Sequence, residues 1–179
     1  VRFSGFPVVA APYGMVLGGG YEMIGACDRV VASAELYCGL VEVGVGLIPG
    51  AGGNLRLISK LEYAQKLKVP GNFQVVQKAF QTIAFAKVSM SANHAQSLGY
   101  LTKEDRVVIN RDYLLNEAKN EVLKMADNYS PPKYKDKIRL PGKTGRLAIE
   151  SSIKGLGLSG ITGIAIRSGD FSIFDFESG

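Results

Sequence analysis

The chain has few of the residues that bind metals or form disulfides. Its 179 residues include one histidine and two cysteines. Cys27 and Cys38 do not form a Cys-x-x-Cys pair, and His94 has no second histidine near it, which excludes a structural zinc site and a disulfide framework. We therefore expect packing roles for both cysteines, a surface or helix-capping role for His94, no metal, and a reducing compartment, the cytoplasm.

Charge is also missing from the start of the chain. No acidic or basic residue occurs from Phe3 to Tyr21, a length that raises the question of a membrane span. Pro7 and Pro12 would break a helix, and the glycines of this stretch lower its helix propensity further. The composition therefore predicts a buried strand followed by a glycine loop, and no membrane span.

Basic residues outnumber acidic ones, 21 to 16, which gives a formal net charge of +5. Such a balance suits an anionic partner without naming it. Six basic residues gather near the C-terminal end: Lys133, Lys135, Lys137, Arg139, Lys143 and Arg146. They could meet ligand phosphates, a neighbouring subunit or only water. Nucleic-acid binding would need interleaved aromatic residues, and Tyr129 and Tyr134 are too few, so we expect no nucleic acid.

Short apolar runs alternate with helical spacings, which indicates the α/β class. We expect strands at 8–11, 30–32 and 36–40, and helices at 21–28, 54–61, 75–86, 91–98 and 111–128. Asn54 is the expected cap of its helix, and residues 47–53 form a glycine-rich loop. A loop is also expected between the first strand and Gly18. The apolar stripe of the last helix comprises Leu114, Leu115, Ala118, Val122, Met125 and Ala126.

Three parts follow from this pattern. Residues 1–107 form the central and later part of a core, and residues 108–129 form an amphipathic helix. Residues 130–179 are expected to be an arm and a tail. Within them, the proline-containing segment 130–145 is predicted to be a solvated connection, and no element is assigned to 155–179.

The triplet Gly18 to Gly20 lies at the predicted start of a helix, where backbone N–H groups lack partners. Without Cβ atoms, a ligand oxygen can approach these groups closely. The N–H of Gly19 could then hold a carbonyl oxygen that develops negative charge. Phosphate binding and a simple packing turn are the other two interpretations of the same glycines.

Two glutamates add acid–base chemistry to this region. Glu22 follows Gly19 by three residues, so its carboxylate is directed to the same end of the helix, where it could also serve only as a favourable charge. Glu42 has apolar and glycine neighbours on both sides. Such a carboxylate must be paired, hydrogen-bonded or raised in pKa, and a raised pKa suits proton transfer near neutral pH.

Two sequence segments resemble a known family. Residues 7–28 contain Pro-Val-Val-Ala-Ala, Leu-Gly-Gly-Gly-Tyr-Glu and Ala-Cys-Asp, and residues 39–53 run Gly-Leu-Val-Glu-Val-Gly-Val-Gly-Leu-Ile-Pro-Gly-Ala-Gly-Gly. Both are similar to signatures of the crotonase (enoyl-CoA hydratase/isomerase) superfamily. The resemblance implies a crotonase-like fold of ββα spiral units with surrounding helices, of which the N-terminal part is missing here.

A finer resemblance is to bifunctional 3-hydroxyacyl-CoA dehydrogenases that carry a hydratase domain at their C-terminal end. Residues 11–15, 41–46, 86–89 and 110–114 are similar to that subgroup. The resemblance implies an NAD-dependent dehydrogenase ahead of Val1. This chain itself would then hold no cofactor, because CoA is part of the substrate and NAD would belong to the dehydrogenase part.

The resemblance also implies roles for four residues. Gly19 matches the donor of one N–H of the oxyanion hole, and Glu22 and Glu42 match the two glutamates that hold water and move protons. Gly50 matches the backbone group that seats this water. In the family the second oxyanion N–H comes from a segment well before Pro7, so we expect the isolated chain to be nearly inactive.

The implied reaction is the hydration of a trans-2-enoyl-CoA to a 3-hydroxyacyl-CoA in fatty acid β-oxidation. The partner would be an acyl-CoA thioester, and family members usually form trimers or dimers of trimers, so a homo-oligomer is expected. A family isomerase, or a non-catalytic interaction fragment of the same fold, are the alternatives.

Overall fold

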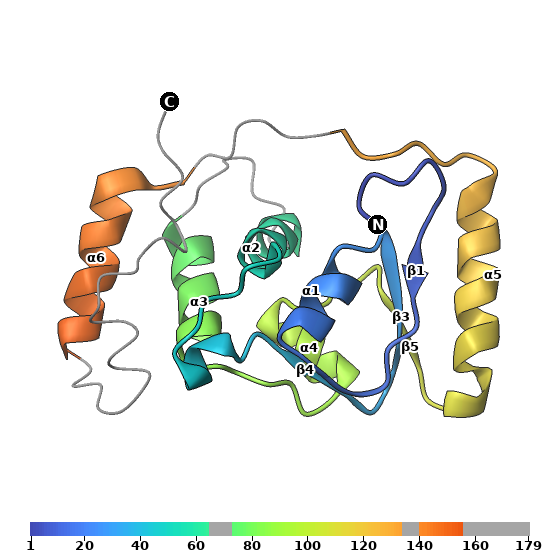
Figure 1. The fold of residues 1–179 in the computed structure, drawn as a ribbon, viewed down its shortest axis with the longest axis horizontal. Coiled ribbons are helices and arrows are strands. Elements are labelled where there is room, and N and C mark those ends of the chain that lie inside the picture. The colour runs from blue at the N-terminus through green and yellow to red at the C-terminus, as the bar shows by residue number, and fades with distance from the viewer. Residues whose placement is uncertain (65–72, 134–139, 156–179) are drawn as a thin grey trace.

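The protein is described by a computed structural model that covers residues 1–64, 73–133 and 140–155. Short parallel strands lie among helices (Figure 1). The strands are β1 (Val9–Ala10), β2 (Gly14–Leu17), β3 (Arg29–Ser33), β4 (Leu36–Gly39) and β5 (Arg106–Val108). The α-helices are α1 (Gly19–Gly25), α2 (Gly53–Ala64), α3 (Phe73–Ala84), α4 (Ala92–Leu98), α5 (Leu114–Ala126) and α6 (Gly142–Gly155). The 3₁₀ helices are η1 (Glu42–Val45) and η2 (Arg111–Tyr113).

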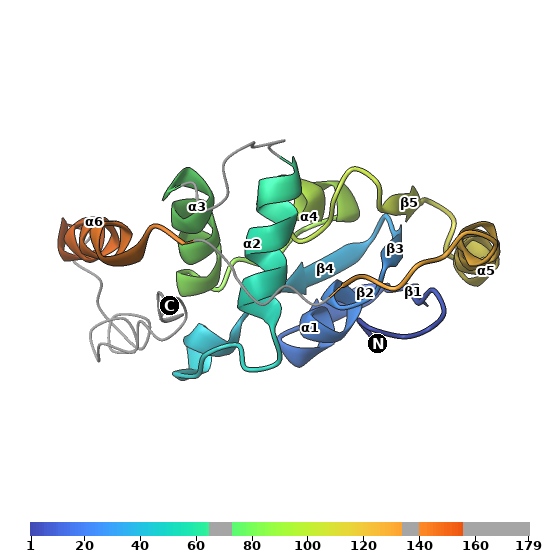
Figure 2. The same ribbon diagram turned by 90° about the horizontal axis from the view of Figure 1, so that it is seen from above.

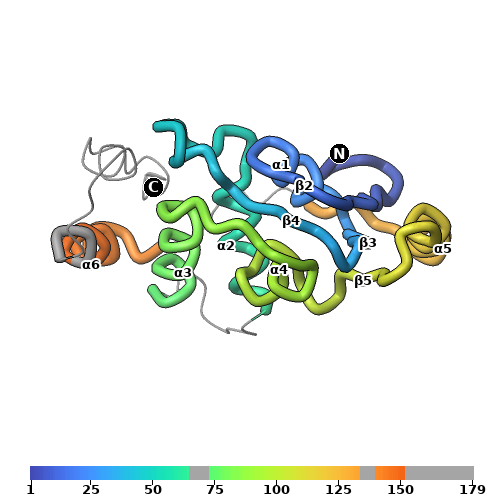
Figure 3. Tube along the Cα trace, turned by 90° about the horizontal axis from the view of Figure 1, so that it is seen from below, coloured from blue at the N-terminus to red at the C-terminus, as the bar shows by residue number. Residues whose placement is uncertain are grey.

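The strands form two small parallel sheets. One has the order β1-β3-β5, and the other pairs β2 with β4. Parallel neighbours need a crossover connection, and α1 lies on the connection in both sheets. Helix α5 lies beside the three-stranded sheet, while α6 packs beside α3 at the opposite end of the molecule (Figures 2 and 3).

The main core lies between the β2-β4 sheet and the helices α1, α2, α3 and α4. Its largest fully buried side chains include two tyrosines, Tyr21 and Tyr100, beside leucines from β4 and α2. Both cysteines are free, and Cys38 is part of this core, in agreement with the predicted packing role. The core therefore lies directly beneath the segments that carry both glutamates.

The strands predicted near residues 9, 30 and 37 and the helices predicted in the first 128 residues are present, with shifted ends. Ser91 caps α4 by accepting a hydrogen bond from the N–H of His94, and His94 Nδ1 accepts one from the N–H of Met90. The predicted capping role of His94 is thus confirmed. Of residues 155–179, to which no element is assigned from the sequence, Gly155 is the last residue of α6, and 156–179 lie outside the described residues.

Two predictions near the site are wrong. Residues 14–17 are not a loop but β2, which pairs with β4 along its whole length. Its apolar run is too short to show a period, and only the partner strand defines it. Asn54 does not cap α2, because the helix begins at Gly53, and the Asn54 side-chain amide donates to the Pro49 carbonyl oxygen at 3.4 Å.

Two predictions in the C-terminal third also need correction. Leu115, at 76% exposure, and Ala126 lie outside the buried face of α5, which consists of Leu114 and Ala118, because the helix contacts the sheet along one narrow strip. The segment 130–145 is not a connection along its whole length, because α6 begins at Gly142. The burial of Ile149 against α3 stabilises this helix. The three-part division of the chain stays a prediction.

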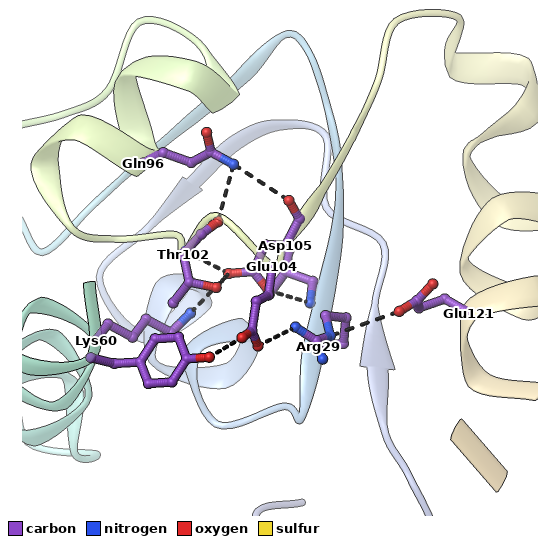
Figure 4. A network of polar contacts seen from close by, with 9 residues as sticks. Arg29, Lys60, Gln96, Thr102, Glu104, Asp105 and Glu121 are labelled. Carbon is purple, nitrogen blue, oxygen red and sulfur yellow. Dashed lines mark hydrogen bonds and ion pairs between the residues drawn. The ribbon is translucent and has the colours of Figure 1, made fainter. Parts of the chain in front are cut away.

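A network of hydrogen bonds and ion pairs connects helices α2 and α5 to strand β3 of the three-stranded sheet (Figure 4). Asp105 accepts hydrogen bonds from the N–H groups of Val30, at 2.9 Å, and Thr102, at 2.7 Å, and lies 3.7 Å from Lys60 of α2. Arg29 pairs with Glu104 at 2.8 Å, and its Nε lies 3.8 Å from Glu121 of α5. The loop before β5 therefore connects α2 with β3, and Arg29 of β3 extends the network to α5.

Asp28 joins the beginning of the described chain to the end of α5. Its Oδ2 accepts hydrogen bonds from the N–H of Val8 and from the hydroxyl of Tyr129, both at 2.9 Å. Because Asp28 directly precedes β3, these two contacts hold β1 and the residues after α5 against the same turn.

The end of β4 approaches residues 87–89 so closely that only glycine fits there. A Cβ atom at Gly39 would lie 2.5 Å from the Lys87 carbonyl oxygen and 3.2 Å from the Val88 Cα. Both obstacles are backbone atoms, so Gly39→Ala is expected to lower the free energy of unfolding by about 1–3 kcal/mol in urea titration. Gly5→Ala, whose Cβ meets nothing within 4 Å, is the control. Equal midpoints for the two variants would contradict this packing.

Candidate active site

The site begins where β2 passes into α1. Gly18 has φ +54°, a conformation that favours glycine, and its N–H donates to the Gly39 carbonyl oxygen at 2.8 Å. Helix α1 then starts at Gly19, and both Gly19 and Gly20 are exposed. The N–H groups that open a helix have no acceptor within it. The Gly19 N–H therefore has no acceptor within α1, which is a condition that an oxyanion donor must meet.

Glu42 stands against the same glycine turn. It is the first residue of η1, directly after the turn that follows β4. A Cβ atom at Gly18 would lie 3.3 Å from Glu42 Oε1, so the absence of a side chain at this position leaves space for the carboxylate. The two glycine-rich segments that are separate in the sequence thus meet at Gly18 and Glu42.

Glu22 is buried, with 5% exposure, and its position is fixed by backbone donors. The N–H groups of Ala51 and Gly53 both donate to its Oε1, at 2.8 Å each. These donors come from the loop that leads into α2. The sequence did not predict them, although the Gly-Ala-Gly-Gly run before a helix is a signal for a backbone that approaches another group closely.

The surroundings of Glu42 raise the pKa of its carboxyl group above that of a glutamate in water. Burial raises the pKa of Glu42, the N–H groups of Glu42 and Val41 oppose this, and the negative charge of Glu22 raises the pKa further. In the described part of the chain, no group forms a hydrogen bond with the buried Glu42 Oε2. One oxygen of this carboxyl group therefore has no hydrogen-bond partner among the described residues, which contributes to the unfavourable burial of its charge.

Three of the four predicted residues lie around one glycine turn, and the fourth lies in the loop whose N–H groups hold Glu22. Gly19, Glu22 and Glu42 lie around one glycine turn, whereas Gly50 is exposed in the loop before α2. The loop groups that bind Glu22 belong to Ala51 and Gly53. The role of Gly50 as a seat for water stays a prediction, as do the roles of the other three.

Neither a metal cluster nor a membrane helix is found in the described ranges. Across residues 1–64, 73–133 and 140–155, no three His, Cys, Asp or Glu side chains gather as metal ligands. Within those ranges, each helix is too short or too polar to cross a bilayer. The chemistry that the described site offers is that of two carboxyl groups and backbone N–H donors.

Comparison with known proteins connects this geometry to a family. The profile of the family described as enoyl-CoA hydratase/isomerase matches residues 1–72. A probable 3-hydroxyacyl-CoA dehydrogenase of Bacillus subtilis is 41% identical over 173 residues, which are 97% of this chain and 21% of that protein. The chain belongs to the crotonase superfamily. A short-chain-enoyl-CoA hydratase of Clostridium acetobutylicum is a more distant relative of this crotonase chain, 33% identical over 68% of the chain and 40% of that protein.

Solved structures show the same fold. An enoyl-CoA hydratase from Mycobacterium marinum superposes with a TM-score of 0.52 at 28% identity, over 94% of this crotonase chain and 57% of that one. The predicted α/β, crotonase-like fold is thus confirmed. The chain spans about a fifth of the length of the Bacillus relative and just over half of the Mycobacterium structure.

The raised pKa of Glu42 predicts how the stability of this crotonase chain depends on pH. Between the ordinary pKa of an unfolded glutamate and the raised pKa of Glu42, the folded state binds more protons, so stability falls as pH rises through this window. Glu42→Gln removes the buried charge and is expected to unfold at higher urea concentration at neutral pH.

The gain should vanish below the ordinary glutamate pKa, where the folded and unfolded states of the wild type are both protonated. Glu35→Gln, at an exposed position, serves as the control and is expected to change the midpoint little at any pH. A Glu42→Gln midpoint at or below that of the wild type at neutral pH would show that burial does not destabilise the charged carboxylate.

Proposed function

We propose that this site adds water to the double bond of a trans-2-enoyl-CoA thioester and forms a 3-hydroxyacyl-CoA, a step of fatty acid β-oxidation. The observation that carries the proposal is the different treatment of two neighbouring carboxyl groups. Glu22 is fixed as an acceptor by two backbone N–H groups, whereas Glu42 has a raised pKa and an unpaired oxygen. Such a pair can accept and donate a proton in one step.

The two glutamates would divide the work as their surroundings suggest. The Glu22 carboxylate accepts a proton from a water molecule as the water oxygen bonds to C3 of the substrate. Glu42, whose raised pKa favours its protonated form, donates its own proton to C2. The carbon–carbon π bond is lost, one C–O and one C–H bond form, and the two carboxyl groups exchange protonation states.

The Gly19 N–H would stabilise the charge that develops during this addition. As C3 is attacked, negative charge moves to the thioester carbonyl oxygen, and a donor aimed at this oxygen lowers the barrier. One such donor is worth about 10²–10³ in rate. The position of Gly19 at the exposed start of α1 supports this role, and the loop that contains Gly50 would seat the water.

The relatives support a wider role for the gene product that contains this chain. The Bacillus subtilis relative, similar over 97% of the chain, is described as a probable 3-hydroxyacyl-CoA dehydrogenase. A 3-hydroxyacyl-CoA is both the product of the proposed hydration and the substrate of such a dehydrogenase. We infer that hydration and an NAD-dependent oxidation follow one another in this gene product.

The test is the hydration of crotonyl-CoA, followed by the loss of ultraviolet absorbance of the conjugated thioester. It is performed with the complete gene product and with the 179-residue chain. We expect multiple turnovers from the complete protein and a rate lower by about 10²-fold or more from the chain alone, as the loss of one oxyanion donor requires. A complete protein that does not hydrate enoyl-CoA thioesters refutes the proposed function.

A further inference from the structure

Tyr100 lies fully buried in the core, and its hydroxyl bridges two backbone segments. The hydroxyl donates to the Lys87 carbonyl oxygen at 2.7 Å and accepts a hydrogen bond from the Leu40 N–H at 3.1 Å. Leu40 is the first residue after β4, where the chain leaves the sheet and turns into η1. Glu42 follows two residues later. The Tyr100 hydroxyl is therefore the polar partner of the turn that carries Glu42.

The same side chain contacts the helix that carries Glu22. The rings of Tyr100 and Tyr21 pack edge to face, with centroids 4.6 Å apart, and the Tyr21 hydroxyl donates to the Tyr100 carbonyl oxygen at 3.3 Å. Tyr21 is in α1, one residue before Glu22. Tyr100 thus touches both segments that carry the glutamates.

The backbone of Tyr100 is itself firmly held. It follows Gly99, whose φ of +93° ends α4, and its carbonyl oxygen also accepts a hydrogen bond from Lys60 of α2 at 3.1 Å. Lys60 belongs to the Asp105 network of Figure 4. The backbone of Tyr100 is thus held against α2 and its ring is fully buried, so the hydroxyl can act as a fixed acceptor for the Leu40 N–H.

We propose that Tyr100 is a positioning residue that sets the place of Glu42 relative to Glu22. The inference rests on the proposed function, since the spacing of the two carboxyl groups is what it explains. Phenylalanine would fill the same volume, but it would leave the Leu40 N–H without an acceptor in the core, which is unfavourable unless the turn moves. The hydroxyl, rather than the ring, therefore determines the position of Glu42.

The first test follows the Glu42 carboxyl group itself in the 179-residue chain. Carbon-13 NMR titration reports its pKa without any need for turnover. The groups that face Glu42 are Glu22 from α1 and Tyr100 from the segment after α4. The matched control, Tyr21→Phe, changes neither of these side chains and retains the Tyr100 hydroxyl as the acceptor for the Leu40 N–H. We expect Tyr100→Phe to lower the pKa of Glu42 toward that of an exposed glutamate, and Tyr21→Phe to leave it unchanged.

Tyr21→Phe distinguishes the positioning role of Tyr100 from a general loss of stability. Both variants lose one fully buried hydroxyl and keep the aromatic ring, so both should lower the urea midpoint similarly. If Tyr100→Phe leaves the pKa of Glu42 at the wild-type value, or if Tyr21→Phe shifts it equally, the inference is overturned.

Amide hydrogen exchange of the wild type gives a second measurement that needs no variant. Protection of the Leu40 N–H to the level of global unfolding supports the inference, and rapid exchange overturns it.

Turnover by the complete gene product separates this inference from the proposed function. We expect Tyr100→Phe to lower kcat for crotonyl-CoA hydration by about tenfold with KM unchanged, and to shift its pH profile, because the acid is misplaced. If Glu42→Gln lowers turnover but Tyr100→Phe does not, the positioning role fails while the hydratase stands. If the wild type does not hydrate the substrate, the proposed function fails, and the NMR titration still decides where Tyr100 holds Glu42.

Discussion

Glu42→Gln is expected to lower the rate of crotonyl-CoA hydration by the complete gene product by about 10²–10⁴-fold, the usual contribution of a positioned general acid. Glutamine has nearly the shape of glutamate but cannot give a proton to C2. The loss should fall on kcat, because in the proposed mechanism the variant keeps the Gly19 N–H and the Glu22 carboxylate. Steady-state kinetics at several substrate concentrations measure the effect.

The same variant is expected to gain stability at neutral pH, so that activity and stability change in opposite directions. This pairing excludes unfolding as the cause of the lost turnover. Glu35→Gln, an exposed substitution of the same kind, should leave kcat within about twofold, since surface changes away from a site have small effects. If Glu42→Gln keeps most of the wild-type kcat, Glu42 is not the proton donor.

Gly53→Ala is expected to lower kcat by about 10²-fold, because small displacements of a catalytic group have effects of this size. A Cβ atom at this position would lie 2.6 Å from Leu40 Cδ2 and 3.0 Å from both Cγ and Oε1 of Glu22. The methyl group would therefore push Glu22 away from the N–H groups that hold it. It would also lower the free energy of unfolding by about 1–3 kcal/mol, as overpacking does.

The control for this substitution is Gly44→Ala in η1. A Cβ atom there would meet only the Ala86 Cβ, at 3.9 Å, which is an ordinary contact. A comparable fall in kcat in both variants would mean that the loop responds to any added methyl group. A fall confined to Gly53→Ala would connect the loop before α2 to the position of Glu22.

The elements that the sequence predicts well are those whose residues bury one continuous face. Helix α3 shows this, because its apolar residues follow the helical period. Val75, Ala79 and Ile83 lie in the main core, and the adjacent Val76, Phe80 and Ala84 pack in the cluster that includes Ile149. Strand β2 could not be found in this way. It has four residues, Met15 is 76% exposed, and the strand exists only because β4 offers a matching row of hydrogen bonds. Pairing across a crossover is invisible to a local pattern.

The sequence likewise indicates some residues of the candidate site and not others. Residue type and position indicate Glu22 and Glu42, because charge among apolar and glycine neighbours is unusual along the chain itself. Their partners are not indicated, because Ala51 and Gly53 act through backbone N–H groups that every residue has. Tyr100 is hidden for a related reason, since a tyrosine in an apolar stretch predicts a core residue but not the turn that its hydroxyl reaches.

The hydrogen bond between Tyr129 and Asp28, which are far apart in the sequence, has a consequence for the synthesis of the protein. β3 is translated long before its neighbour β5, and Asp28 receives its bond from Tyr129 only after α5 has been made. Until then a nascent chain lacks the residues that cover Val31, namely Val108 of β5 and Leu114 and Ala118 of α5, as expected for a topology with distant parallel pairings. We expect this interval to be the stage at which chaperones bind the growing polypeptide.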